Sequence, residues 1–389
     1  MRSRTPSRTR RRATIVAAAT ASIAAGAALL PTWSAGAAVA DDPTVDARTR
    51  ATFQRLADAV FTDRTNALVA GPEKPLTDRF SGDVRLSSRT ARGEEAALST
   101  LERRKDLLAR LGERYREADT AVTLDATRVT GRTAKATVTE TTTLTYAEVR
   151  GDEPATTGFQ ARHELTFTAD RRGDWQLTGI RDTDPGVAVN TIAKPSVKAP
   201  KAPAVDDTMP SAPRAATTYP APAKPKTLTG TALDYKGMAA YAEKYWRNYN
   251  TDYPDFNGQG AGGDCTNFVS QALKAGGWKH VPGYVYDYTR WFGNAEIQSH
   301  SFVGVNEWSW FAQNSKRTTS LANVYQMDIG DVLQMDFDKN GSKDHTMIVT
   351  YRSPQGMPYL TYHSTNTYRR SLASVIASDP NAAYYAYRT

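Results

Sequence analysis

The clearest alternation of apolar and polar positions lies in residues 262–277, which read GGDCTNFVSQALKAGG. Apolar residues recur there at the three- and four-residue spacing of one helix face: Phe268, Val269, Ala272 and Leu273. The glycine pair at 276–277 is typical of the end of a helix. The pattern therefore predicts a short helix that begins at about residue 265 and buries one face.

Cys265 stands at the predicted start of this helix. Asp264 precedes it, and a short acidic side chain there suits the N-cap position. Unpaired amides and the positive end of the helix dipole stabilise a thiolate at such a place. We therefore predict a nucleophilic cysteine at residue 265.

The remaining pattern of residues 227–389 mixes helices and strands. Helical spacing covers 233–249 and 306–314. Strand-like runs cover 332–337, 345–351, 359–364 and 383–387. This order predicts an α+β domain in which the cysteine-bearing helix packs on an antiparallel sheet.

Residues 44–184 predict a second α+β domain. Helical patterns at 45–68 and 94–117 precede strand-like runs at 121–130, 134–146, 161–168 and 175–181. Helices followed by a meander favour a helix packed on a curved sheet, which resembles the ketosteroid-isomerase-like cone folds used as accessory domains. We interpret its one histidine, His163, as solvent-exposed or structural.

The two segments that flank this domain differ from it in composition. Residues 1–40 combine six arginines, an apolar run and small residues, as in a secretory signal peptide; Arg10 and Arg11 leave Sec and twin-arginine export open. Residues 185–226 hold nine prolines without apolar periodicity and predict an extended linker. We expect a secreted, extracellular or cell-wall-associated protein.

The charge of the chain is concentrated in its first forty residues. The formal net charge of +8 falls to about +2 without them, because they hold six basic and no acidic residues. A charge this small argues against nucleic-acid binding. No later stretch is long and apolar enough to span a bilayer, and we expect a monomer that stays off the membrane once the signal is removed.

A single cysteine in an exported chain is informative, because exported proteins usually pair their cysteines. One left over forms an intermolecular disulfide, is a free reactive thiol, or is buried as a small apolar side chain. A cysteine nucleophile needs a base and a group that orients the base. His345 begins one predicted strand and His363 ends another. If these strands are antiparallel neighbours, both histidines lie at one sheet edge beside Cys265.

These residues resemble the bacterial putative amidase domain, which is grouped with the papain-like NlpC- and CHAP-type hydrolases, many of which cut peptidoglycan. The motifs that carry the resemblance are 264–271 (DCTNFVSQ), 241–245 (YAEKY), 330–334 (GDVLQ) and 344–349 (DHTMIV), within 233–389. The resemblance implies that Cys265 is the nucleophile, that His345 is the base, and that His363 orients it, with Asn366 as the alternative.

The resemblance also implies which groups border the substrate. The backbone amide of Cys265 would be the first oxyanion donor. Tyr253, Asp264 and Asn267 are expected beside the substrate or the oxyanion, although Asn267 suits helix packing equally well. The implied activity is cofactor-independent hydrolysis of an amide in cell-wall peptides through an acyl-thioester. The alternatives are acyl transfer or proteolysis on another substrate, and a non-catalytic wall-binding or scaffold protein.

One stretch suggests a metal site. Asp336, Asp338, Asn340 and Gly341 follow the start of a calcium loop, but the twelfth position is Met347 in place of an acidic residue. Asn-Gly between two strands is also the sequence of a tight hairpin turn. We therefore predict no metal and keep calcium as the alternative.

Overall fold

The computed structural model describes residues 45–69, 74–184, 186–192, 212–221, 224–257 and 263–389. The predicted signal peptide, residues 1–40, and the middle of the predicted linker lie outside the described residues. Among the described residues, no helix combines the length and apolar character that crossing a membrane requires.

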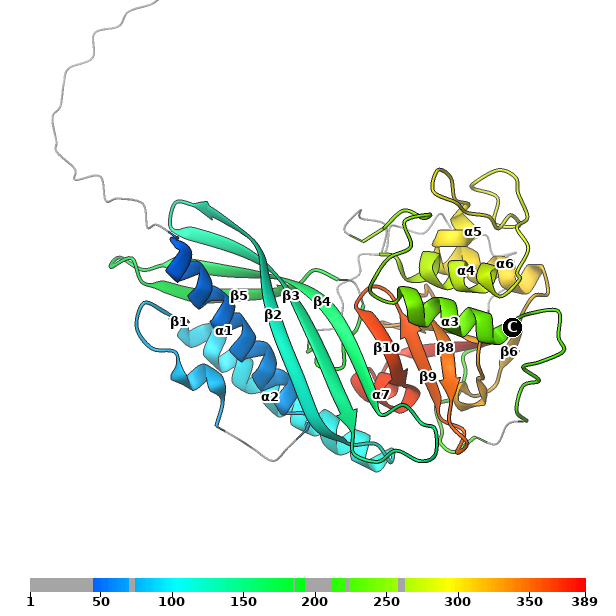
Figure 1. Ribbon diagram of the computed structural model, residues 1–389, viewed down its shortest axis with the longest axis horizontal. Helices are drawn as coiled ribbons and strands as arrows, with labels where there is room; N and C mark the ends of the chain where they lie inside the picture. Colours follow the sequence, from blue (N-terminus) through cyan, green and yellow to red (C-terminus); the bar gives the residue numbers. More distant parts are fainter. Residues whose placement is uncertain (1–44, 70–73, 185, 193–211, 222–223, 258–262) are drawn as a thin grey trace, which may run out of the picture. The chain divides into compact units, whose positions relative to one another are not determined.

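The N-terminal elements form helices on a strongly twisted antiparallel sheet. They are α1 (Ala47–Asn66), η1 (Leu76–Arg79), β1 (Val84–Leu86), α2 (Ser88–Arg110), β2 (Tyr115–Thr130), β3 (Thr133–Tyr146), β4 (Thr156–Ala169) and β5 (Trp175–Asp182). Figure 1 shows α1 and α2 along one face of β2 to β5. Apolar residues of α1, among them Phe53, pack there against Val138 and Phe167 of the sheet. The helix-on-sheet arrangement predicted for this region is confirmed.

One boundary in this region differs from the prediction. We expected the second helix to reach residue 117, but α2 ends at Arg110 and β2 begins at Tyr115. Gly112 has a φ of 79° between them, a conformation that ends a helix and that glycine adopts without strain.

The C-terminal elements place α3 to α6 on one face of a second antiparallel region and α7 on the other face. They are α3 (Tyr235–Tyr245), α4 (Cys265–Ala275), α5 (His300–Val303), α6 (Val305–Asn314), β6 (Thr319–Leu321), η2 (Val324–Gln326), β7 (Val332–Asp336), β8 (His345–Arg352), β9 (Pro358–Tyr362), β10 (Asn366–Ser371), α7 (Leu372–Ser378) and β11 (Ala383–Arg388). The cysteine-bearing helix on an antiparallel sheet is confirmed. The sequence patterns had not indicated β10 or α7.

Two apolar cores lie on the two faces of this C-terminal sheet. Phe268, Val269 and Ile348 belong to the core under α3, α4 and α6. Met347 and Val349 belong to the core on the other face. Because side chains alternate along a strand, odd and even positions of β8 point to different cores.

The strands run in the order β1-β5-β4-β10-β9-β8-β7-β11-β6, with β3 also paired to β4 and β2 to β3. The first residues of β4 pair with β10, with Gln160 opposite Asn366, while later residues of β4 pair with β5. Residues 187–190, from the predicted linker, are buried. The predicted domain boundaries at 44–184, 185–226 and 227–389 stay predictions.

Candidate active site

Helix α4 starts at Cys265, as its sequence predicts. Asp264 occupies the N-cap position, but its side chain makes no capping bond. Its Oδ1 instead accepts hydrogen bonds from the side-chain amide of Asn267 (2.8 Å) and from the backbone N–H of Phe256 (3.2 Å). The prediction that the Asp264 side chain caps the helix is therefore wrong. Its carboxylate instead joins α4 to the loop that precedes it.

The Cys265 thiol is buried, with 2% of the residue exposed. Burial raises its pKa to about 11, although the Thr346 backbone amide and the Thr266 hydroxyl both act to lower it. Thr266 also meets Thr346 through a hydroxyl–hydroxyl hydrogen bond of 2.8 Å. In the described conformation the sulfur is thus a protonated thiol held between the helix and β8.

Asp264, the residue before Cys265, forms a buried pair with His363. The Nδ1 of His363 lies 2.6 Å from Oδ2 of Asp264, and its Nε2 lies 2.8 Å from the backbone carbonyl oxygen of Tyr245 at the end of α3. Both partners are acceptors, so a hydrogen on each ring nitrogen satisfies both bonds. His363 is therefore on the face of the sheet that α4 covers, with both nitrogens occupied.

Aromatic rings fix the plane of this imidazole. Tyr249 and Phe268 stack on its two sides, each with a centroid separation of 3.9 Å. The Tyr249 hydroxyl donates to Oδ1 of Asn366 (2.7 Å) and accepts from the side chain of Asn257 (2.6 Å). Asn366 thus contacts Tyr249, the residue whose ring stacks on His363. It supports the imidazole indirectly and does not orient it by a direct contact.

The turn that follows His363 is strained. Ser364 and Thr365 both have positive φ values, 61° and 74°, as a type I′ hairpin turn requires and as non-glycine residues rarely adopt. The Ser364 hydroxyl accepts a hydrogen bond from the Asp264 backbone N–H (2.9 Å). Strained backbone of this kind is concentrated at functional sites.

His345 is near His363 along the sheet but on its other face. β8 and β9 are antiparallel neighbours, as predicted, with Ile348 opposite Thr361. Continuing this register places Thr346 opposite His363, and opposite residues share a face. Thr346 contacts the cysteine helix. His345 precedes it on β8 and therefore points to the other face, because side chains alternate along a strand.

The contacts of His345 agree with this placement. Its ring meets Tyr362 edge-on at 5.2 Å and lies 6.5 Å from Phe337, and both rings belong to the core on the far face. Its Nε2 is buried and finds no hydrogen-bond partner in the part of the chain that the structure describes. Burial and the charge of Arg370 lower its pKa to about 3. The structure does not bring Cys265 and His345 together.

Two predicted substrate contacts have structural partners. The Asn267 amide bridges Asp264 and the Pro254 carbonyl oxygen (2.9 Å), and the side chain is fully buried. The Tyr253 hydroxyl accepts a hydrogen bond of 2.9 Å from Lys274, near the end of α4. Nine residues of helix, about 13 Å, separate Lys274 from Cys265, so this hydroxyl lies at the opposite end of the helix.

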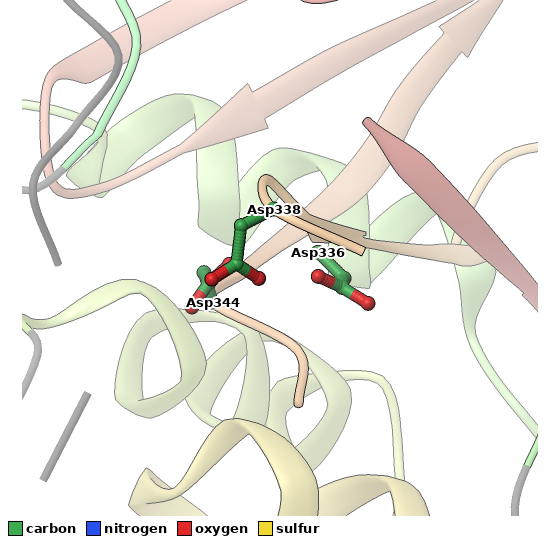
Figure 2. Close-up of side chains that lie close together, drawn as sticks. All are labelled: Asp336, Asp338 and Asp344. Atoms are coloured by element: carbon green, nitrogen blue, oxygen red, sulfur yellow. The ribbon is translucent and has the colours of Figure 1, made fainter. Parts of the chain in front are cut away.

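Three carboxylates gather at the turn between β7 and β8. Ligand atoms of Asp336, Asp338 and Asp344 all lie within 4.8 Å of one another. Figure 2 shows the three side chains close together at this turn. Asp336 accepts hydrogen bonds from the backbone of Asn340 (3.2 Å) and Gly341 (2.9 Å), which holds the turn. Sequence inspection had missed Asp344, the ninth position of the loop, and its pKa is raised to about 6 by burial.

A second buried histidine cluster lies in the N-terminal region. His163 on β4 contacts Asp182 through Nδ1 (2.9 Å) and Glu140 through Nε2 (3.1 Å). Burial alone would lower its pKa, but the hydrogen bonds and charges of Asp182 and Glu140 raise it to about 9. We had seen no acid–base pair in this region, because neither carboxylate is close to His163 in sequence.

The comparisons with known proteins concern the C-terminal part of the chain. The uncharacterized protein YhbB of Bacillus subtilis (strain 168) is 31% identical over 147 residues, which cover 36% of this chain and 45% of the relative. The uncharacterized protein YjcM of the same organism is 32% identical over 143 residues, which cover 36% of this chain and 34% of that relative. The match thus spans less than half the length of either curated relative.

One solved structure, the intermembrane space region of the chloroplast protein ARC6, aligns with 36% of this chain and 98% of its own. The TM-score is 0.24 and the identity is 16%, values that support no inference about this chain. Residues 232–387 match the family model described as "Putative amidase domain". These residues contain the whole of the Cys265–Asp264–His363 arrangement, and the match indicates an amide hydrolase.

Proposed function

We propose that the C-terminal region is a secreted cysteine amidase or endopeptidase of papain-like type that acts on cell-wall peptides, and that residues 44–184 form its cone-like accessory domain. The observation that carries the proposal is the buried Asp264–His363 pair at the start of the cysteine helix. A carboxylate that orients an imidazole next to a thiol is the arrangement that cysteine hydrolases use.

The proposal assigns the base to His363, whereas the family resemblance implies His345. His363 shares the face of the sheet that α4 covers, and Asp264 already holds its Nδ1. To accept the thiol proton, Nε2 must leave the Tyr245 carbonyl oxygen and release its own hydrogen to solvent, so that the imidazole is neutral with its remaining hydrogen on Nδ1 toward Asp264. A bound substrate that moves α3 away from His363 would free Nε2 from the Tyr245 carbonyl oxygen. The same movement would admit solvent to Cys265.

The chemistry then follows in two halves. His363 takes the proton of Cys265, and the thiolate attacks the substrate carbonyl carbon to give a tetrahedral oxyanion near the amides at the helix start. The C–N bond breaks as the imidazolium donates its proton to the leaving amine. Water, deprotonated by the same imidazole, attacks the thioester and releases the carboxylic acid and the thiol.

The test is incubation of the full chain lacking residues 1–40 with purified muropeptides, followed by mass spectrometry. We expect new amine and carboxyl termini with the native sequence and none with Cys265→Ala. Ser270→Ala is the matched control, because it removes one buried heteroatom one turn further along the same helix and should leave hydrolysis intact. Cleavage by folded Cys265→Ala would overturn the assignment of the nucleophile.

A non-catalytic wall-binding or scaffold role is the second candidate, and the buried thiol with its raised pKa favours it. Iodoacetamide labelling separates the two. The resting thiol should react slowly at pH 7, because its pKa of about 11 leaves almost no thiolate. A catalytic site should label faster once cell-wall peptide is added, whereas a scaffold should label at one slow rate with or without peptide.

A further inference from the structure

A cavity of about 350 Å³ lies away from the candidate active site. Its walls come from residues 109–114 at the end of α2, residues 146–153 after β3, Tyr219, and residues 353–359 at the turn into β9. His363 follows the opposite end of β9. The cavity therefore calls for an explanation separate from the amidase chemistry.

Glu113 has one side-chain oxygen in this cavity that lacks a partner, although Ser371 and Tyr115 both contact its carboxyl group. The residue is 8% exposed, and its Oε2 accepts a hydrogen bond from the Ser371 hydroxyl. Its Oε1 is buried and has no hydrogen-bond partner among the described residues. A buried acceptor left unpaired is costly, and a ligand that donates a hydrogen bond to it recovers that cost.

The surrounding charges favour a cation. Glu148 and Glu153 line the rim together with Arg114 and Arg150. Arg150 is already engaged, because its Nη2 donates to Glu148 at 2.9 Å and its backbone N–H donates to Glu153 at 2.9 Å. Three carboxylates and two guanidiniums line the cavity, while burial raises the pKa of Glu113 and the charge of Arg370, outside the lining, opposes that rise.

Tyrosine rings supply the apolar walls. Tyr146 and Tyr359 meet edge to face with centroids 5.9 Å apart, and Met357 and Tyr219 complete this side. The faces of such rings attract cations. Burial raises the pKa of Tyr359, and the negative charges of Glu113 and Glu153 raise it further, which is consistent with an acidic interior.

We propose that this cavity binds the primary ammonium group of a small ligand, with Glu113 Oε1 as the hydrogen-bond acceptor and Tyr146 and Tyr359 as its walls. The ammonium group belongs either to a free amine or to the α-amine of a short peptide. Binding does not depend on the proposed hydrolysis, so the Cys265→Ala variant binds the same ligands. If the proposed function holds, the amine released from an amide is a candidate occupant.

The test is isothermal titration calorimetry of the full chain with benzylamine, with benzyl alcohol as the neutral probe of the same size and with Phe-Gly as the peptide amine. We expect saturable binding of at least one of the two amines, at least tenfold tighter than binding of the alcohol. Tighter binding of benzylamine would identify the ligand as a free amine, and tighter binding of Phe-Gly would identify it as the α-amine of a peptide. Equal affinity for the alcohol and both amines, or no binding of either amine, would overturn the proposal.

Variants locate the binding. Glu113→Gln should weaken amine binding at least tenfold, and Glu117→Gln, the same change at an exposed position of β2, should not alter it. Because Glu113 is buried, Ala147→Trp provides a second variant that fills the cavity from an exposed rim position and should abolish binding in a folded protein. Unchanged amine binding in folded Ala147→Trp would place the ligand elsewhere and contradict the proposal.

Discussion

The chain holds two buried histidines in similar surroundings, one in each half. His163 and His363 both place Nδ1 against an aspartate, Asp182 and Asp264 respectively. Phe61 stacks on the first ring and Phe268 on the second. The difference lies at Nε2, which faces the carboxylate of Glu140 in one case and a neutral backbone carbonyl in the other.

This difference separates a structural histidine from one that can act as an acid–base group. A hydrogen bond in which a partner is ionised is roughly twice as strong as one between two neutral groups. The proton on Nε2 of His163 is therefore held by a second charge, and no thiol lies beside it. His363 has to give up one neutral acceptor, the Tyr245 carbonyl oxygen, together with the hydrogen on Nε2, and Cys265 follows its carboxylate partner directly in the sequence.

The largest expected effect comes from exchanging each histidine for glutamine. His363→Gln should lower kcat for peptide hydrolysis by about a thousandfold, since it removes the proposed acid–base group. His163→Gln should leave kcat per folded molecule unchanged and lower only the stability. Activity assays normalised to the folded fraction by circular dichroism make the comparison. Equal kcat losses in the two variants would mean that neither histidine is the base.

The next effect is a pH dependence of stability. Because the pKa of His163 is raised from 6.5 to about 9 in the fold, its contribution is complete below pH 6.5 and is lost as the pH rises to 9. The loss should be on the order of 3 kcal/mol. Urea unfolding between pH 6 and 9 measures it. His163→Gln should flatten this slope, and a variant that keeps the full slope would assign the dependence to other groups.

A smaller effect is expected from Gly186, which packs against the strained turn after His363. A Cβ at Gly186 would lie 1.3 Å from the carbonyl oxygen of Ser364, so the turn must shift. Gly186→Ala should cost about 2 kcal/mol of stability and lower kcat about tenfold through displacement of His363.

The control for this substitution is Gly93→Ala in α2. Nothing lies within 4 Å of a Cβ at that position, and alanine favours a helix over glycine. It should leave kcat unchanged and the stability equal or higher. If Gly186→Ala loses stability while kcat stays at the native value, the turn does not position His363.

The start of α4 could be predicted from local sequence, whereas the strand β10 could not. Glycines, an aspartate and apolar spacing placed the start of α4 at Cys265, because these signals act within a few residues. The strand β10 was missed because Arg369 and Arg370 make it look exposed. Arg370 is buried and Arg369 half-buried, and each depends on a distant partner: Glu243 for Arg369 and the Val187 carbonyl oxygen for Arg370.

The face of the sheet on which His345 lies could not be predicted from local sequence, for a related reason. A strand's register decides which residues face which core, and a shift of one residue exchanges the faces. Here the register is set by pairing of β8 with β7 and β9, in which Met335 lies opposite His345. Adjacent strands were predicted, but not the side of the sheet.

The smallest expected effect is that of His345→Leu, and it decides between the two candidate bases. Leucine has a similar volume and removes a buried nitrogen that has no partner, so stability at pH 7 should change by no more than about 1.5 kcal/mol. The pKa of His345 is lowered to about 3. Its contribution to stability is therefore present above pH 6.5 and is lost as the pH falls from 6.5 toward 3.

The leucine variant should lack this acid-dependent loss, so urea midpoints at pH 7 and pH 4 should differ less in His345→Leu than in the native protein. Its kcat should stay within about twofold of native, because the imidazole points away from Cys265. A kcat as low as that of His363→Gln would instead mean that β8 turns its first residue toward α4 during catalysis. The base implied by the family resemblance would then be correct, and His363 would be the residue that orients it.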